Sequence, residues 1–176
     1  MKLFFHSRAV GLLPLCALAL VTLILRPELA QALPQDGQVF QDWTARCETD
    51  PSDASVKRCY IVQAVVAGEQ RQRVMLMAVA YPPGQETPLA TAILPLGTDL
   101  RPGIEVAIDD GEPKRYPFSV CMADGCQAHM PLDAALLAAF KKGVGGSVAF
   151  LRGPDRRALK VPFSLKGFTA AVNALK

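Results

Sequence analysis

Four of the five cysteines, Cys47, Cys59, Cys121 and Cys126, carry most of the potential chemistry of this chain. Cysteines form disulfides, act as redox pairs or bind metal ions. Cys121 and Cys126 are separated by four residues, whereas the C-x-x-C redox motif separates its cysteines by two. With His129 they give a C-x4-C-x2-H spacing, which lacks a fourth metal ligand. We therefore predict a structural disulfide framework, no metal site, and thiol-disulfide redox chemistry at Cys121 and Cys126 as the alternative.

Four cysteines allow three pairings, and the residues between them favour the two local ones. Cys47 and Cys59 flank a polar stretch containing Pro51, which we expect to be a loop between two strands with a disulfide at its base. Cys121 and Cys126 flank an Asp-Gly pair, which suits a tight hairpin turn. A disulfide there would hold the tip of the hairpin.

Catalytic side chains are scarce once the N-terminal region is set aside. His6 lies in that region, so His129 is the remaining side chain suited to proton transfer near neutral pH. Three serines, Ser119, Ser147 and Ser164, are candidate nucleophiles, but none lies in a G-x-S-x-G motif. We predict no catalytic residue, no cofactor and no enzymatic activity, and rank a histidine-dependent hydrolase third among the hypotheses.

The N-terminus has the features of an export signal. Lys2 and Arg8 precede an apolar run over 9–25, and an Ala-Gln-Ala sequence ends at Ala32. We predict cleavage after Ala32 and a periplasmic or secreted protein. The apolar run is near the lower length limit of a membrane-spanning helix, so an uncleaved anchor is the alternative and the one predicted contact with the membrane.

Residues 33–176 form one predicted domain of nearly neutral charge. They hold 16 Lys and Arg residues against 15 Asp and Glu, whereas the whole chain has a net charge of +3. The basic residues are scattered among acidic ones rather than gathered in a patch. Nucleic-acid binding is therefore not predicted.

Short apolar or alternating runs separated by turn residues predict a mainly β protein. The expected strands cover 39–47, 57–67, 71–81, 89–96, 104–109, 115–121, 147–151 and 158–163. The run 71–81 is apolar on both faces, so we expect a central strand covered on both sides. Residues 33–37 are expected to be disordered.

Two short helices complete the prediction. The first covers 133–142, with Asp133 at its start and Gly143 at its end. The second is expected to be capped by Ser164 and to bury one face, which consists of Phe168, Ala171, Val172 and Leu175. Many strands and few helices favour an antiparallel β-sandwich.

Short motifs in a fixed order extend over nearly all of residues 33–176. They are Trp43 with Cys47, CYIVQ at 59–63, IDDG at 108–111, FSVC at 118–121 with GCQA at 125–128, and FSLKGFTAA at 163–171. In order and spacing they resemble the invasion-associated locus B family of bacterial exported proteins. The resemblance implies an immunoglobulin-like β-sandwich, an envelope or secreted location and, for pathogen members, a part in host-cell entry. It implies no catalytic residues.

These observations predict an exported binding module. The partner is expected to be a protein or a component of the cell envelope. Either the surface of the sandwich or an exposed edge strand is expected to bind it, and addition of a partner strand is the natural mode for an edge.

Overall fold

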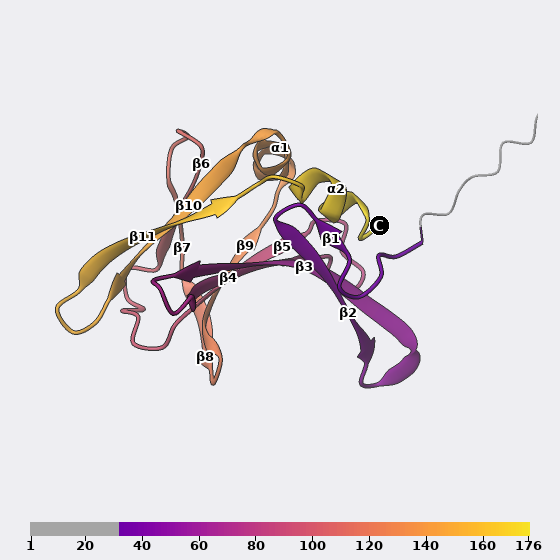
Figure 1. The fold of residues 1–176 in the computed structure, drawn as a ribbon, viewed down its shortest axis with the longest axis horizontal. Helices are drawn as coiled ribbons and strands as arrows, with labels where there is room; N and C mark the ends of the chain where they lie inside the picture. The colour runs from indigo at the N-terminus through magenta and orange to yellow at the C-terminus, as the bar shows by residue number, and fades with distance from the viewer. Residues whose placement is uncertain (1–31) are drawn as a thin grey trace, which may run out of the picture. The chain divides into compact units, whose positions relative to one another are not determined.

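The computed structural model describes residues 32–176, so the predicted signal segment lies outside the described residues apart from Ala32. Two antiparallel sheets make up most of this region (Figure 1). The seven-stranded sheet contains, in spatial order, β1 (Val39–Phe40), β2 (Trp43–Asp50), β3 (Asp53–Ala67), β4 (Gln72–Ala80), β5 (Leu89–Leu94), β9 (Gly125–Pro131) and β8 (Phe118–Met122). The four-stranded sheet contains β11 (Arg157–Ser164), β10 (Gly145–Arg152), β6 (Ile104–Ile108) and β7 (Lys114–Tyr116). The predicted mainly-β sandwich is confirmed.

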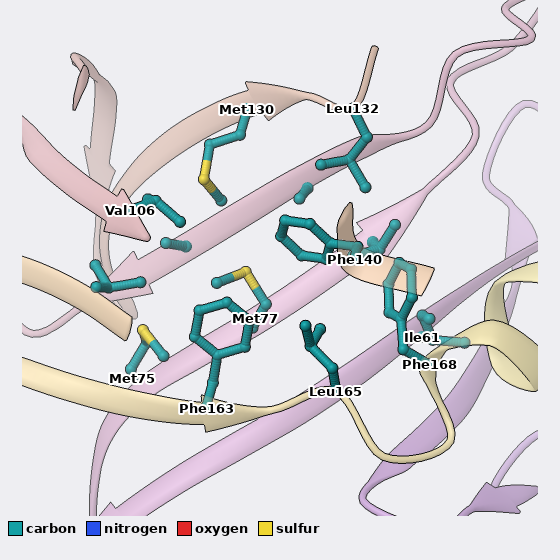
Figure 2. Packing of buried hydrophobic residues seen from close by; sticks show 14 of the residues in the cluster. Ile61, Met75, Met77, Val106, Met130, Leu132, Phe140, Phe163, Leu165 and Phe168 are labelled. Carbon is teal, nitrogen blue, oxygen red and sulfur yellow. The ribbon is translucent and has the colours of Figure 1, made fainter. Parts of the chain in front are cut away.

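The four-stranded sheet and both helices, α1 (Ala134–Lys142) and α2 (Phe168–Asn173), lie on one side of the seven-stranded sheet (Figure 1). Alternate residues of the strands fill the space between the sheets, including Met75 and Met77 of β4 and Val148 of β10, all at most 1% exposed. Figure 2 shows Met77, Phe140 and Phe163 pointing into this common core. This burial is the main stabilising contribution to the fold.

Four aromatic rings connect the two sheets through the two helices. Trp43 of β2 packs edge-on against Phe168 of α2, with ring centroids 5.2 Å apart. Phe168 lies 5.3 Å from Phe140 of α1, which lies 5.9 Å from Phe163 of β11. Each pair is within the distance range of favourable aromatic contacts. Both helices are therefore part of the core rather than attachments to its surface.

The first helix forms as predicted, whereas the predicted cap of the second is wrong. Asp133 caps α1, and its carboxylate accepts a hydrogen bond of 2.7 Å from the backbone N–H of Leu136. The residue preceding α2 is Gly167, not Ser164. Its φ of +84° and its close approach to the carbonyl of Phe40 exclude a side chain there. Ser164 is the last residue of β11, and its hydroxyl accepts a hydrogen bond from the N–H of Lys166.

The predicted loop between Cys47 and Cys59 is also wrong, because β2 and β3 continue through most of it. The turn is limited to Pro51 and Ser52. Asp50 shapes this turn, since its carboxylate accepts hydrogen bonds from both the N–H and the hydroxyl of Ser52. Outside the sandwich the hairpin is solvated on both faces, so its strands lack the apolar alternation that would identify them.

The expected strand 115–121 is divided between the two sheets. β7 belongs to the four-stranded sheet and β8 to the seven-stranded one, with Pro117 between them. Proline has no N–H to continue a ladder, so the chain changes sheets there. The expected disorder of residues 33–37 is wrong as well. Pro34 is buried, and the Asp36 carboxylate accepts a 3.0 Å hydrogen bond from the N–H of Cys47.

Gln63 is a buried polar residue that ties the two sheets together. Its side chain is directed inward from β3, and the residue is 7% exposed. The amide nitrogen donates to the carbonyls of Asp42 and Ser164 at 3.1 and 3.0 Å, and the amide oxygen accepts from the Ser164 N–H at 2.7 Å. The indole N–H of Trp43 donates to the same Ser164 carbonyl at 3.1 Å. The Gln63 side chain thus links β3 to the end of β11 with hydrogen bonds that a neighbouring strand would otherwise make.

Replacing Gln63 by alanine should destabilise the protein by about 3 kcal/mol, because three hydrogen bonds are lost and the Asp42 carbonyl and the Ser164 N–H lose their partner. Urea unfolding of residues 33–176 measures the change. Gln127→Ala, at a half-buried position on the opposite face of the same sheet, is the control and should cost less than about 1 kcal/mol. Equal losses for the two variants would show that Gln63 has no special part in the fold.

Asp50 should make the stability depend on pH in acid. Hydrogen bonds from the Ser52 hydroxyl and N–H, and the ion pair with Arg58, lower the pKa of Asp50 to about 2. An unfolded aspartate titrates near pH 4, so this contribution is complete above about pH 4 and is lost as the pH falls toward about 2. Asp50→Asn should flatten the fall in melting temperature over this range. The exposed turn residue Asp110 supplies the control, Asp110→Asn, and identical acid profiles for wild type and Asp50→Asn would refute the assignment.

Candidate functional site

The side of the seven-stranded sheet that faces away from the four-stranded sheet, called here the outer face, is the candidate site. Along β4, Met75, Met77 and Val79 are buried in the core. Leu76 and Ala78 point the other way and are half-buried. The prediction that this strand is central is confirmed, but the prediction that both of its faces are covered is wrong. Among residues 32–176, no helix or strand is layered over the outer face (Figure 1).

The strand register places the side chains of the outer face in rows across the sheet. One central row contains Thr44, Val62, Ala78, Thr91 and His129. The next contains Ala64, Leu76, Ile93, Gln127 and Val120. His129 is the one ionisable side chain in these two rows. Charged residues lie outside these two rows: Arg46 pairs with Tyr60 in the adjacent row, Glu48 pairs with Arg58 in the row beyond it, and Arg73 pairs with Val66 at the other end of β3.

The outer side of the four-stranded sheet is very different. Glu105 and Arg115 form an ion pair there at 2.5 Å, and Lys160 projects from β11, two strands away from Glu105. Ala149 lies opposite both Glu105 and Lys160 in the register. A solvated antiparallel sheet usually carries such polar residues on its exposed side. The two central rows of the seven-stranded sheet differ from this pattern: six of their ten residues are apolar, three are uncharged polar residues and one is His129. Apolar residues gathered on an exposed surface typically mark an interaction site.

The edge strand β8 extends the uncharged surface to the margin of the sheet. It contains no charged residue, and Val120 and Met122 are 45% and 57% exposed. The edges of the other sheet carry residues that discourage strand pairing: Lys114 and Arg115 in β7, and Arg157, Lys160 and Pro162 in β11. β8 lacks such charged residues, but a bulge at Ser119 interrupts its register, and bulges also discourage strand addition.

The four cysteines lie in two cross-strand disulfides. Cys47 is joined to Cys59 across β2 and β3, and Cys121 to Cys126 across β8 and β9. Cys121 is exposed at the edge, whereas Cys126 is 3% exposed. The second disulfide thus fixes the edge strand at the end of the outer face.

His129 lies on the outer face and not in a catalytic arrangement. Its Nε2 atom is 3.5 Å from the Oε1 atom of Gln127, and it faces Thr91 across the ladder. Ser147 and Ser164 belong to the other sheet, and Ser119 makes no hydrogen bond with His129. Within residues 32–176 there is no cluster of three or more potential metal ligands, and no helix that is long and apolar enough to cross a membrane.

Two features of the structure differ from what the sequence predicts. The apolar character of both faces of 71–81 predicts full burial, whereas the structure leaves the outer face of this strand uncovered. Gln63 is an isolated glutamine in an apolar strand, and its partners in β11 lie 101 residues away. Neither periodicity nor local spacing identifies a contact of that separation.

The comparisons with known proteins agree with one another. A family model described as "Invasion associated locus B (IalB) protein" matches residues 43–176. Invasion protein B homologs of Brucella abortus, from strain 2308 and from biovar 1 strain 9-941, are each 28% identical over 175 residues, which is 97% of this chain and 96% of each relative. The crystal structure of invasion associated protein B from Bartonella henselae aligns with a TM-score of 0.68 at 20% identity, covering 78% of this chain and 92% of that one. That structural likeness supports the fold.

The disulfide pairing can be tested directly. Peptide mapping without reduction should yield only the Cys47–Cys59 and Cys121–Cys126 peptides. Cys47→Ser with Cys59→Ser should destabilise the domain by about 3 kcal/mol, and Cys121→Ser with Cys126→Ser by about 2 kcal/mol, because the second loop is shorter. Both bonds should resist mild reduction in the folded protein. Selective and easy reduction of the Cys121–Cys126 bond would instead favour the redox alternative.

Proposed function

Because this chain belongs to the invasion associated locus B family, we propose that it is an exported envelope protein that acts by binding a protein partner through the outer face. The relatives from Brucella abortus are named invasion protein B homologs, so a part in host-cell entry is included in the proposal. The observation that carries it is the absence of charge from the two central rows of the outer face, apart from His129.

An exported location is supported by the disulfides and by the sequence of the N-terminus. Two disulfides are typical of proteins that fold outside the reducing cytoplasm. The Ala-Gln-Ala sequence ending at Ala32 provides a site for signal peptidase. We propose that the mature protein begins at Leu33.

A non-enzymatic role is supported by the surroundings of His129. A general base needs a nucleophile or a proton donor within hydrogen-bond reach. The closest polar partner of the His129 ring is the Gln127 amide, which takes no part in proton transfer. His129→Ala is therefore expected to preserve the biological activity.

The energetic argument for binding rests on the apolar residues of the face. Leu76 and Ile93 are adjacent in the register, and Val120 lies in the same row at the margin. Removing such side chains from water is favourable by about 25 cal/mol for each Å² of apolar surface, and this gain must exceed the entropic cost of association. The central strands are hydrogen-bonded on both sides and supply rigid positions for these contacts, which lowers that cost.

Site-specific crosslinking in the living bacterium tests the proposal. A photoreactive amino acid is introduced at Ala78, in the centre of the outer face, or at Ala149, which is also a half-buried alanine of an inner strand but lies on the other sheet. We expect ultraviolet light to join the protein to a partner from position 78 and not from position 149. Mass spectrometry then identifies the partner.

The opposite pattern would refute the binding surface. Adducts from position 149 alone, or equal adducts from both positions, would mean that the outer face is not the contact. A protein without any adduct from position 78 would likewise contradict the proposal, provided that the labelled protein is exported and folded.

A further inference from the structure

We infer that the protein partner covering the outer face is a second copy of this chain, related to the first by a two-fold axis that lies between the stacked sheets. The inference rests on the proposed function, since it concerns the same surface and specifies which molecule binds there. Three properties of the outer face support it: its charge, the sizes of its side chains and its area.

A two-fold contact places the same surface patch on both sides, so charges near the axis meet their own copies. Like charges in close contact are strongly unfavourable, and a self-associating surface must therefore be nearly free of charge at its centre. The central rows meet this condition, because His129 at one end of its row is their one ionisable residue. The nearly balanced charge of residues 33–176 adds little long-range repulsion between copies.

The sizes of the side chains on the outer face also suit the stacking of two copies. Small and larger side chains are placed diagonally on β3 and β4: Val62 and Ala64 of β3 lie opposite Ala78 and Leu76 of β4. Packed sheets are about 10 Å apart and require side chains that interdigitate. The larger residues of one copy can occupy the space over the alanines of the other.

The face is large enough for a small but specific dimer. Six strands at about 4.8 Å spacing give a width of roughly 24 Å. The two central rows with one flanking row on each side, about 6.8 Å apart, give roughly 20 Å along the strands. Arg46 lies in one flanking row, away from the centre of the face. Each copy then contributes about 500 Å², and a dimer buries about 1,000 Å², near the lower limit of specific interfaces. Such an area is consistent with a dissociation constant in the micromolar range.

Analytical ultracentrifugation of purified residues 33–176 tests the inference. We expect wild-type protein to dimerise with a dissociation constant of about 1 to 50 µM. Ala78→Lys should weaken dimerisation by about 100-fold or more, because two ammonium groups would be buried near the axis. Ala149→Lys is the matched control and should dimerise like wild type, since its new charge lies on the other sheet, between Glu105 and Lys160.

A charge-reversal pair identifies the symmetry of the contact. Ala78→Lys and Ala78→Glu should each be monomeric, and an equimolar mixture should form a heterodimer. Thr91→Lys, on the neighbouring strand of the same row, replaces Ala78→Lys if circular dichroism shows that the latter is unfolded. A heterodimer from the mixture would establish that the outer faces of two copies meet.

Several results would overturn the inference. Wild-type protein that remains monomeric to about 500 µM, tenfold above the expected range, excludes the dimer. Equal weakening by Ala78→Lys and Ala149→Lys would place the contact elsewhere. If the protein is monomeric but position 78 crosslinks to a different protein in the bacterium, the second copy is excluded while the proposed binding function stands.

Discussion

The buried amide of Gln63 determines how the two sheets are joined. It supplies three hydrogen bonds to backbone groups of Asp42 and Ser164, and so substitutes for a strand between β3 and β11. On the other side of the sandwich, the sheets are connected covalently where Pro117 links β7 to β8. The aromatic series from Trp43 to Phe163 fills the interior between these two connections. Without the Gln63 contacts, the Asp42 carbonyl and the Ser164 N–H would lose a hydrogen-bond partner, the Trp43 indole alone would hold the Ser164 carbonyl, and the edge of β11 would be free to separate from β3.

The way in which the two sheets are joined has a direct consequence for the surface of the protein. The four-stranded sheet and both helices are committed to one side of the seven-stranded sheet, so the wider sheet keeps its other side uncovered. In the four-stranded sheet, the corresponding side carries charged residues near its centre, namely the Glu105–Arg115 ion pair and Lys160, among small and apolar residues such as Ala149 and Leu151. The difference between the two sheets is therefore not a general property of the fold. It is a property of the residues on β3, β4 and β5, and it gives the molecule one side suited to contact with a partner.

The sequence predicted most elements of the fold but not their long-range arrangement. Local signals such as Asp133 before a helix and the apolar alternation of Ile104 and Val106 identified α1 and β6 correctly. The predicted and observed elements differ where solvation or chain topology overrides the local hydrophobic pattern. The β2–β3 hairpin is polar because it projects into solvent, and Pro117 interrupts what appeared to be one strand. The double-sided apolar pattern of β4 predicted its central place in the sheet. Whether another layer covers its second face depends on the number of strands and helices available, which periodicity does not encode.

The central claim is that the outer face is buried against a partner in the bacterium, and hydroxyl-radical footprinting measures this burial most directly. Leu76 and Ile93 report on the outer face, and Leu151, also half-buried, reports on the outer side of the four-stranded sheet. The account predicts that Leu76 and Ile93 are protected from oxidation in intact cells and become reactive in purified protein diluted to the monomer, whereas Leu151 reacts equally in both. Equal reactivity of Leu76 and Ile93 in cells and in the diluted protein would contradict the account, because the apolar face would then be exposed to water where the protein works.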